Sequence, residues 1–224
     1  MQVGLFAVVF IAVFTATGIG SRLWLNGNLN VYYCLLSLFF SINLLICYWE
    51  ACLFWRRDYI EERVGYWRER RMQTGRTPAV EFLVTRVPLR KILSPTLWAD
   101  AWATYCMYDD SYADRRTYGF SVDIANGFFT PLPSLILYAA FTTAFMPALF
   151  AGILGVILFW QWTYVSSVYW VSFFVSRRQE LISKADTYIY IWGATAVWVL
   201  FGLLGLYVSI RLIIDGDYTV LGYW

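Results

Sequence analysis

The sequence predicts an all-α integral membrane protein with about five transmembrane helices, in a single domain that covers residues 1–224. Hydrophobic residues make up 60% of the chain and charged residues only 14%, whereas a soluble domain has roughly 45–50% and about 25%. The apolar residues are also concentrated in five long segments. A chain of this composition has more apolar surface than a soluble fold can bury, which predicts lipid as the solvent for much of it.

Five apolar segments have the length of about 20 residues that a helix needs to cross about 30 Å of hydrocarbon. We expect spans at about 4–20, 31–55, 124–145, 148–175 and 188–210. The first segment has no preceding Lys or Arg and no clear A-x-A site after it, so we interpret it as a retained span. Pro147 separates the third and fourth spans, because proline lacks an N–H and disfavours helix before it. The sequence therefore predicts a helical hairpin there.

A long basic and aromatic segment, residues 56–123, connects the second and third spans, and we expect it at the membrane surface. Residues 56–74 predict a charged helix that continues the second span and ends at Gly75. Residues 79–87 predict a short strand or an interfacial stretch. A further helix is expected to begin at Ser94 or Thr96 and to run to about residue 108.

That further helix carries an aromatic face, because its aromatic residues recur at the i, i+4, i+7 positions that share one side of a helix. These residues are Trp98, Trp102 and Tyr105. Aromatic side chains of this kind favour the headgroup level of a bilayer. We therefore expect an amphipathic helix that lies on the membrane.

The distribution of the 17 Lys and Arg residues predicts the topology. Twelve lie in residues 56–123 and three in residues 176–187, which leaves only Arg22 and Arg211 elsewhere. The positive-inside rule then predicts both segments and the N-terminus on the cytoplasmic (or equivalent) side, with the C-terminus opposite.

Polar residues within the second span are the first candidates for a site. Asn43, Cys47 and Glu50 fall at i, i+4, i+7 and share one helical face. Because polar groups in hydrocarbon usually face protein or a cavity, this face is either the wall of a ligand cavity or a helix-packing surface. Glu50 is also close enough to the charged helix to pair with one of its arginines.

Two further groups of polar residues are candidates. Asp123 and Asn126 lie where the third span begins, and Asp123 there can also stabilise a helix N-terminus. In the fourth span, Gln161, Tyr164 and Ser167 lie close to one helical side, with Trp160, Trp162, Tyr169 and Trp170 around them. They predict one wall of an aromatic pocket for a flat apolar ligand, or hydrogen bonds between helices.

The run from Tyr108 to Tyr118 is dense in charge. Asp109, Asp110 and Asp114 can gather around a cation or around Arg115 and Arg116. The alternative is a solvated, salt-bridged turn, since no metal-loop spacing is present. The chain has no His and no C-x-x-C pair, so we expect no metal and no cofactor. Phosphate-loop, hydrolase and nucleic-acid motifs are also absent, and no nucleic-acid partner is expected.

Several of these residues resemble the EXPERA superfamily, which includes the emopamil-binding sterol isomerase and sigma-2-receptor-like proteins. The resemblance lies in Trp102, Tyr105 and Asp110–Tyr112, in Phe120–Asp123 and Thr130–Leu135, in Gln161–Tyr164 and in Trp198. It implies a sterol- or lipid-binding cavity lined by aromatic later spans, with Trp198 among its residues. Family isomerases use a His and carboxylates there. Asn43 and Cys47 stand where that pair is expected, so the resemblance implies impaired isomerase chemistry.

Two functional hypotheses follow. The first is a non-catalytic accessory or structural subunit of a larger membrane complex, with membrane lipids and other membrane subunits as partners. The alternative is an EXPERA-like sterol- or lipid-binding protein or isomerase, with Glu50 or Asp123 as the acid. A transporter or proton-conducting subunit is a third possibility, which the scarcity of charge within the spans disfavours.

Overall fold

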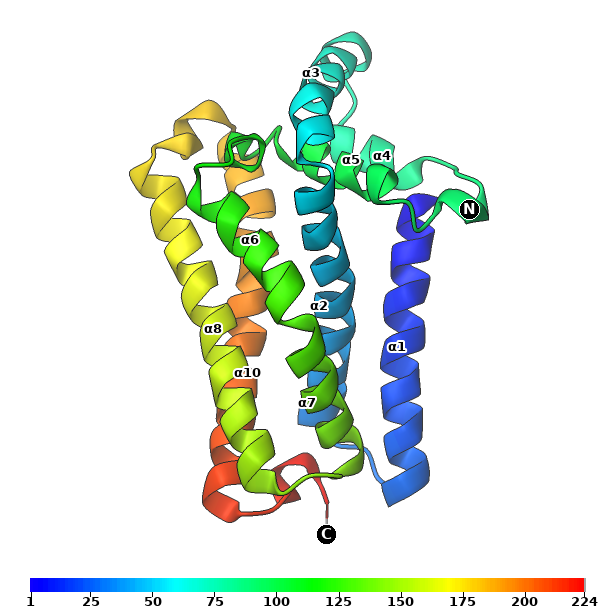
Figure 1. The fold of residues 1–224 in the computed structure, drawn as a ribbon, viewed down its shortest axis with the longest axis vertical. Coiled ribbons are helices and arrows are strands. Elements are labelled where there is room, and N and C mark those ends of the chain that lie inside the picture. Colours follow the sequence, from blue (N-terminus) through cyan, green and yellow to red (C-terminus); the bar gives the residue numbers. More distant parts are fainter. Residues whose placement is uncertain (224) are drawn as a thin grey trace.

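The computed structural model describes residues 1–223, and within that range four helices are long and apolar enough to cross a membrane. A bent pair of shorter helices makes a fifth candidate span. In Figure 1 the long helices stand side by side, with α3, α4 and α5 gathered at one end of the bundle. The predicted all-α fold with about five apolar helices is confirmed for these residues.

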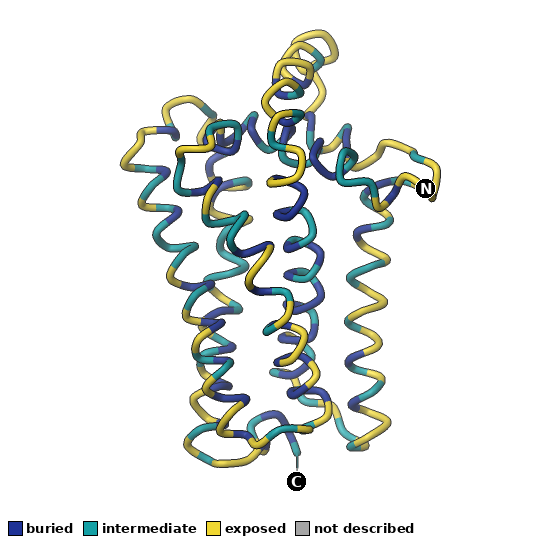
Figure 2. Tube along the Cα trace, viewed as in Figure 1, coloured by how far each residue is buried: buried dark blue, intermediate teal, exposed yellow. Residues whose placement is uncertain are grey.

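The first two long helices, α1 (Val3–Asn26) and α2 (Val31–Trp55), form an antiparallel pair. The helix predicted over 4–20 continues to Asn26 and ends at Gly27, whose positive φ of 68° suits glycine. The Asn30 side chain accepts a hydrogen bond from the Tyr33 N–H and caps α2, which has the predicted bounds. Figure 2 shows α2 buried along much of its length and α1 largely exposed, so α2 is the central helix.

The predicted third span, 124–145, is wrong as a single helix. The chain forms α6 (Tyr118–Phe129) and α7 (Pro131–Thr143), which meet at 53°. Pro131 has no N–H to continue the ladder of α6, so the helix breaks at Thr130. Apolar residues on both sides of the break concealed it in the hydropathy pattern.

The predicted hairpin at Pro147 is confirmed. Helix α7 ends with Ala144 in a left-handed conformation, and Pro147 precedes α8 (Ala148–Val175), which has the predicted bounds. Helix α8 packs closely along α10 (Ala194–Asp215) through glycines. A Cβ added at Gly152 would lie 2.8 Å from the backbone oxygen of Ser209, so the close approach requires glycine.

The last helical stretch is longer than the predicted 188–210. It runs from Lys184 to Asp215 and consists of α9 (Lys184–Asp186), the π-helical segment η4 (Thr187–Gly193) and α10. Within η4, backbone oxygens also accept hydrogen bonds from side chains of other helices. Single-turn π segments of this kind occur frequently at functional sites.

The connecting segment contains α3 (Arg57–Thr74), which continues α2 and ends at Gly75 as predicted. The predicted strand or interfacial stretch at 79–87 is instead the short helix α4 (Pro78–Val84), followed by residues that run beside the start of α1. Helix α5 (Pro95–Tyr105) then crosses the end of the bundle against α2 and α3. Short helical turns complete the connections: η1 (Leu89–Lys91), η2 (Asp110–Ala113), η3 (Arg178–Leu181) and η5 (Thr219–Leu221).

Candidate ligand cavity

A cavity of about 330 Å³ lies between α2, α5, α6, α8 and the first turns of α10. Its wall is predominantly aromatic, with four tryptophans and four tyrosines: Trp49, Trp102, Trp162, Trp198, Tyr105, Tyr112, Tyr169 and Tyr190. Two carboxyl groups, those of Glu50 and Asp123, also reach the wall. The volume is at the lower end of the range of about 300–1,000 Å³ that is typical of small-molecule pockets.

Helix α5 covers the cavity at the end of the bundle. The indole N–H of Trp102 donates to the backbone oxygen of Trp49 at 2.7 Å, and the Tyr105 hydroxyl donates to the backbone oxygen of Tyr190 at 3.1 Å. Trp98 is fully buried and stacks on Trp49, with ring centroids 5.0 Å apart. The aromatic face predicted for the headgroup level therefore faces the protein, because it closes the cavity.

Glu50 is buried and belongs to the cavity wall. Its Oε2 accepts a hydrogen bond of 2.6 Å from Nδ2 of Asn126, on the neighbouring helix α6. The carboxyl group forms no ion pair among the described residues, so the predicted pairing with an arginine of the charged helix is wrong. The register of α2 directs Glu50 inward, toward α6.

Asn126 holds Glu50 in a defined orientation. The Trp162 indole N–H, which can only donate, points at the Asn126 Oδ1 at 3.0 Å, and Thr130 Oγ1 lies 3.1 Å from the same oxygen. The amide oxygen must therefore face Trp162, which turns the NH₂ group toward Glu50.

The other two residues of the predicted polar face of α2, Asn43 and Cys47, are not part of the cavity lining. Cys47 Sγ contacts Thr130 Oγ1 at 3.3 Å, and the Asn43 Nδ2 donates to Ser134 Oγ at 3.4 Å. The Trp198 indole N–H, from α10, reaches Asn43 Oδ1 at 3.4 Å. The shared face predicted for α2 is thus present. Glu50, at one end of this face, borders the cavity. Asn43 and Cys47 form hydrogen bonds with neighbouring helices instead.

Asp123 is half-buried on the cavity wall, one helical turn before Asn126. It forms no ion pair within residues 1–223. Because α6 begins at Tyr118, Asp123 lies beyond the first turn, where the helix dipole has little effect. The predicted N-terminal role is therefore wrong, and the carboxyl group is directed to the cavity.

Two phenols of the cavity roof are held in the protonated form. Burial raises the pKa of both Tyr105 and Tyr112, because the phenolate would lose its hydration there. Both hydroxyls consequently keep their protons over the whole physiological pH range, and that of Tyr105 is donated to the backbone oxygen of Tyr190.

A buried ion pair between Asp109 and Arg178 lies next to Tyr169 of the cavity wall. The Tyr169 hydroxyl donates to Asp109 Oδ2 at 2.7 Å, and Arg178 Nη1 lies 2.5 Å from Asp109 Oδ1. The Asp109 side chain is fully buried, so removal of either partner would leave the other charge buried and unpaired.

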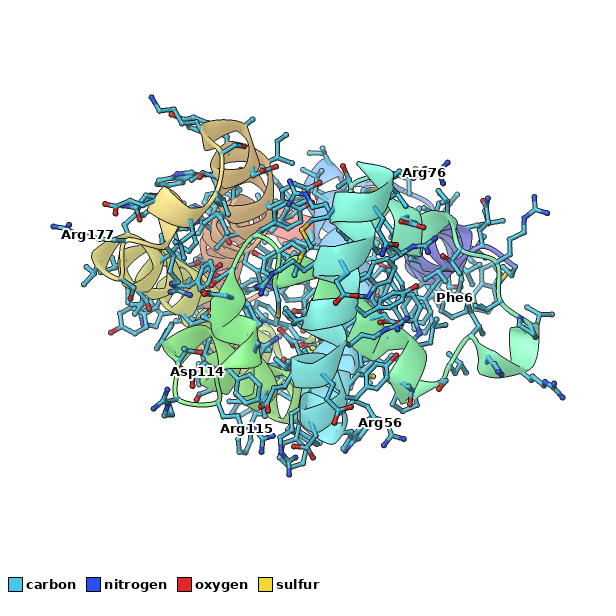
Figure 3. All side chains as sticks on the ribbon, turned by 90° about the horizontal axis from the view of Figure 1, so that it is seen from above. Phe6, Arg56, Arg76, Asp114, Arg115 and Arg177 are labelled. Carbon is cyan, nitrogen blue, oxygen red and sulfur yellow. The ribbon has the colours of Figure 1, made fainter. Side chains whose placement is uncertain are left out.

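The remaining charged residues of the 108–118 run do not gather as predicted. Asp114 pairs with Arg116, Arg115 pairs with Asp58 and Glu61 of α3, and Asp110 is exposed. Asp114 and Arg115 lie at the edge of the molecule in Figure 3. Within the described residues no cluster of three metal-ligating side chains occurs. The salt-bridged turn is the alternative that the structure supports.

The predicted wall of α8 is correct for Trp162 and Tyr169, which line the cavity, and wrong for Gln161 and Tyr164. Tyr164 is 54% exposed and stacks on Trp160, and neither it nor Gln161 reaches the cavity. The cavity face of α8 consists of Trp162, Val165, Ser166 and Tyr169. Their i, i+3, i+4, i+7 spacing is the signal that identifies this face. Trp49, Tyr112 and Tyr190 were also missed, since each lies on a different element.

These features define an all-helical protein with four or five helices of membrane-spanning length and an aromatic cavity that contains two carboxyl groups. Comparison with protein-family models, with curated proteins and with solved structures finds no match for this chain.

Proposed function

We propose that this chain is a multi-pass membrane protein that binds a flat apolar molecule, such as a sterol or a similar polycyclic lipid, in the cavity below α5. The observation that carries the proposal is the cavity itself, which combines eight aromatic side chains with two carboxyl groups that form no ion pair within residues 1–223. Aromatic walls suit a flat apolar body, and the few polar groups orient it. The resemblance to the EXPERA superfamily supports the same ligand class.

Membrane insertion is supported by the apolar side chains that the long helices present outward. Val13 of α1, Ile157 of α8 and Leu203 of α10 are each more than half exposed, at 55%, 60% and 53%. Exposed apolar faces along helices of this length are stable in hydrocarbon and not in water.

The orientation we propose follows the basic residues. Figure 3 looks onto the end with α3, where Arg56, Arg76, Arg115 and Arg177 lie toward the rim. The positive-inside rule assigns this end, with the N-terminus, to the cytoplasmic (or equivalent) side. The cavity then lies within the leaflet nearest that side, which is where a membrane-dissolved ligand is available.

Isomerisation of a ring double bond is the second candidate, because the two carboxyl groups come from neighbouring helices, α2 and α6. One protonated carboxyl group would donate its proton to one alkene carbon and leave a carbocation. The other, as carboxylate, would remove a proton from the saturated carbon next to the cationic carbon, so that the double bond forms one position along the ring with no net oxidation. Trp and Tyr faces stabilise such a cation.

The accessory-subunit hypothesis, with other membrane proteins as partners, stays a prediction. It differs from the proposal in one respect that can be measured. An accessory subunit co-purifies with larger subunits, whereas a lipid-binding protein is stable alone in mild detergent and retains its ligand.

The test is equilibrium binding of tritiated cholesterol to the full chain in nanodiscs. We expect saturable binding that Glu50→Gln and Asp123→Asn each weaken at least fivefold. Trp162→Phe should weaken it about twofold or more, because Phe presents a smaller aromatic face and lacks the indole N–H that holds the Asn126 amide. The matched control is Trp160→Phe, on the same helix but 57% exposed and outside the cavity, which should leave binding unchanged.

Absence of saturable binding, or equal effects of the Trp162 and Trp160 variants, would contradict the proposal. Isomerisation is tested in the same samples by supplying an unsaturated sterol in deuterated water. A shifted double bond with one incorporated deuterium supports the second candidate, and unchanged sterol excludes it for that substrate.

A further inference from the structure

Residues 83–93, here called the interfacial segment, combine free positive charge with exposed apolar side chains. Arg86, Arg90 and Lys91 are all exposed, and none forms an ion pair within the described residues. The sequence from 82 to 99 contains no acidic residue. By contrast, Arg63 and Arg70 of α3 are neutralised by Asp100 and Glu81. The positive charge of the interfacial segment is therefore directed outward.

Apolar side chains of the same segment are also directed outward. Leu89 and Leu93 are 66% and 64% exposed, and Val84 is 55% exposed. An aqueous surface would disfavour three large aliphatic groups in so short a stretch. The alternation of aliphatic and cationic side chains instead suits a bilayer interface, where the former enter the acyl boundary and the latter meet the headgroups.

Hydrogen bonds at both ends fix the depth of the segment. On one side, the Val3 N–H donates to the Thr85 oxygen at 3.1 Å and the Val87 N–H donates to the Met1 oxygen at 3.0 Å. On the other side, the Tyr48 hydroxyl donates to the Leu93 oxygen at 2.5 Å. The segment therefore lies level with the first residues of α1, and Figure 1 shows it beside the end of that helix.

We propose that the interfacial segment binds the headgroups of anionic lipids and anchors this end of the protein at the bilayer surface. The inference rests on the proposed function only in that α1 spans the membrane, which places the interfacial segment at the hydrocarbon boundary. It is independent of the cavity and its ligand. Each cation near an anionic surface contributes about fivefold to association, and three of them act together here.

The binding test titrates dioctanoyl phosphatidylglycerol into the full chain in neutral detergent, with dioctanoyl phosphatidylcholine as the uncharged comparison. We expect the triple variant R86Q/R90Q/K91Q to weaken phosphatidylglycerol binding at least tenfold and to abolish the preference over phosphatidylcholine. The matched control is R68Q/R71Q/R76Q, which removes three exposed cations of α3 and the following turn that form no ion pair with any described residue. It should change binding less than twofold. Equal effects of the two triple variants would overturn the proposal.

Spin labels at three substituted cysteines then separate this proposal from membrane insertion itself. Labels at Leu89→Cys and Val13→Cys report the interfacial segment and the middle of α1, and Met72→Cys, 74% exposed on α3, is the aqueous reference. In phosphatidylglycerol-containing vesicles, we expect the Leu89 label at headgroup depth and the Val13 label in hydrocarbon. A Leu89 label as accessible to water as Met72, with Val13 in hydrocarbon, overturns the anchor alone. A water-accessible Val13 label overturns membrane insertion and the anchor with it.

Discussion

Replacing Gly127 by alanine tests the contact that joins the two carboxyl-bearing helices. Gly127 lies on α6 next to Asn126 and faces α2. An added Cβ would lie 2.7 Å from the Cβ of Glu50, 2.8 Å from the backbone nitrogen of Ala51 and 3.0 Å from the backbone oxygen of Cys47. These atoms belong to the backbone or the first side-chain carbon of a buried helix, so they cannot rotate away. Helix α6 must move instead.

The size of the effect follows from the distances. Carbon atoms pack best at about 3.5–4.0 Å, so α6 has to withdraw from α2 by about 1 Å. Overpacking of this kind costs about 1–3 kcal/mol. Alanine is also favoured over glycine in a helix interior by about 0.5–1 kcal/mol, which partly offsets the cost. Because Asp123 and Asn126 move with α6, the hydrogen bond from Asn126 to Glu50 should lengthen and ligand binding should weaken.

Gly20→Ala is the matched control, since Gly20 lies within α1 and an added Cβ would meet no atom within 4 Å. Both substitutions bring the same gain in helix propensity. The difference between their free energies of unfolding therefore isolates the packing cost. The assay is the free energy of unfolding in mixed detergent and SDS micelles. We expect Gly127→Ala to be less stable than Gly20→Ala by about 1–3 kcal/mol. Equal stability of the two variants would refute the close packing of α6 on α2.

Two further predictions concern buried charges and use the same unfolding assay. Asp109→Asn leaves the buried Arg178 without its partner and should lower the free energy of unfolding by about 3–5 kcal/mol. Adding R178Q to the same chain should recover part of that loss. If the losses of stability from the two substitutions simply add, the direct pair is contradicted. Arg22→Gln removes a fully buried guanidinium that donates to the backbone oxygens of Phe141 and Leu221. It should lower the free energy of unfolding by about 2–4 kcal/mol. Unchanged stability would contradict the role of Arg22 in holding the segment around Leu221 against α7.

The helices could be predicted where the sequence changes character sharply. The bounds of α2 and α8 were predicted correctly because charges or a proline flank a continuous apolar run. The break between α6 and α7 was missed, although Pro131 is visible in the sequence, because apolar residues surround it. The length and hydropathy of an apolar segment do not reveal that a proline within it lacks a backbone N–H. The π-helical start of the last helix has no comparable local signal.

Site residues could be predicted in segments where polar residues are rare. In α8, where aromatic residues are common on every side of the helix, the residues that face the cavity could not be told apart from the others. Glu50, Asp123 and Asn126 stand out in apolar segments, and all three line the cavity. On α8, tryptophans and tyrosines occur on both faces, so their presence cannot separate Tyr164, which faces outward, from Tyr169, which faces inward. Only the packing of α8 against α6 and α10 determines which face is enclosed.

The roof of the cavity could not be predicted from α5 alone. Its aromatic face has the spacing of an amphipathic surface helix, and that pattern is the same whether the face contacts lipid or protein. The structure turns it toward α2, where Trp98 stacks on Trp49. Periodicity therefore identifies which residues share a face, and tertiary contacts determine what that face meets.

The most direct test of the central claim is an experimental density map of the full chain purified in its native membrane extract. The proposed function predicts flat or elongated density between α2, α6 and α8, bounded by Trp162 and Tyr169 and within contact distance of Glu50 and Asp123. It also predicts lipid or detergent around the outer faces of α1, α8 and α10. A cavity closed by its own side chains, or one that contains only water, would contradict it.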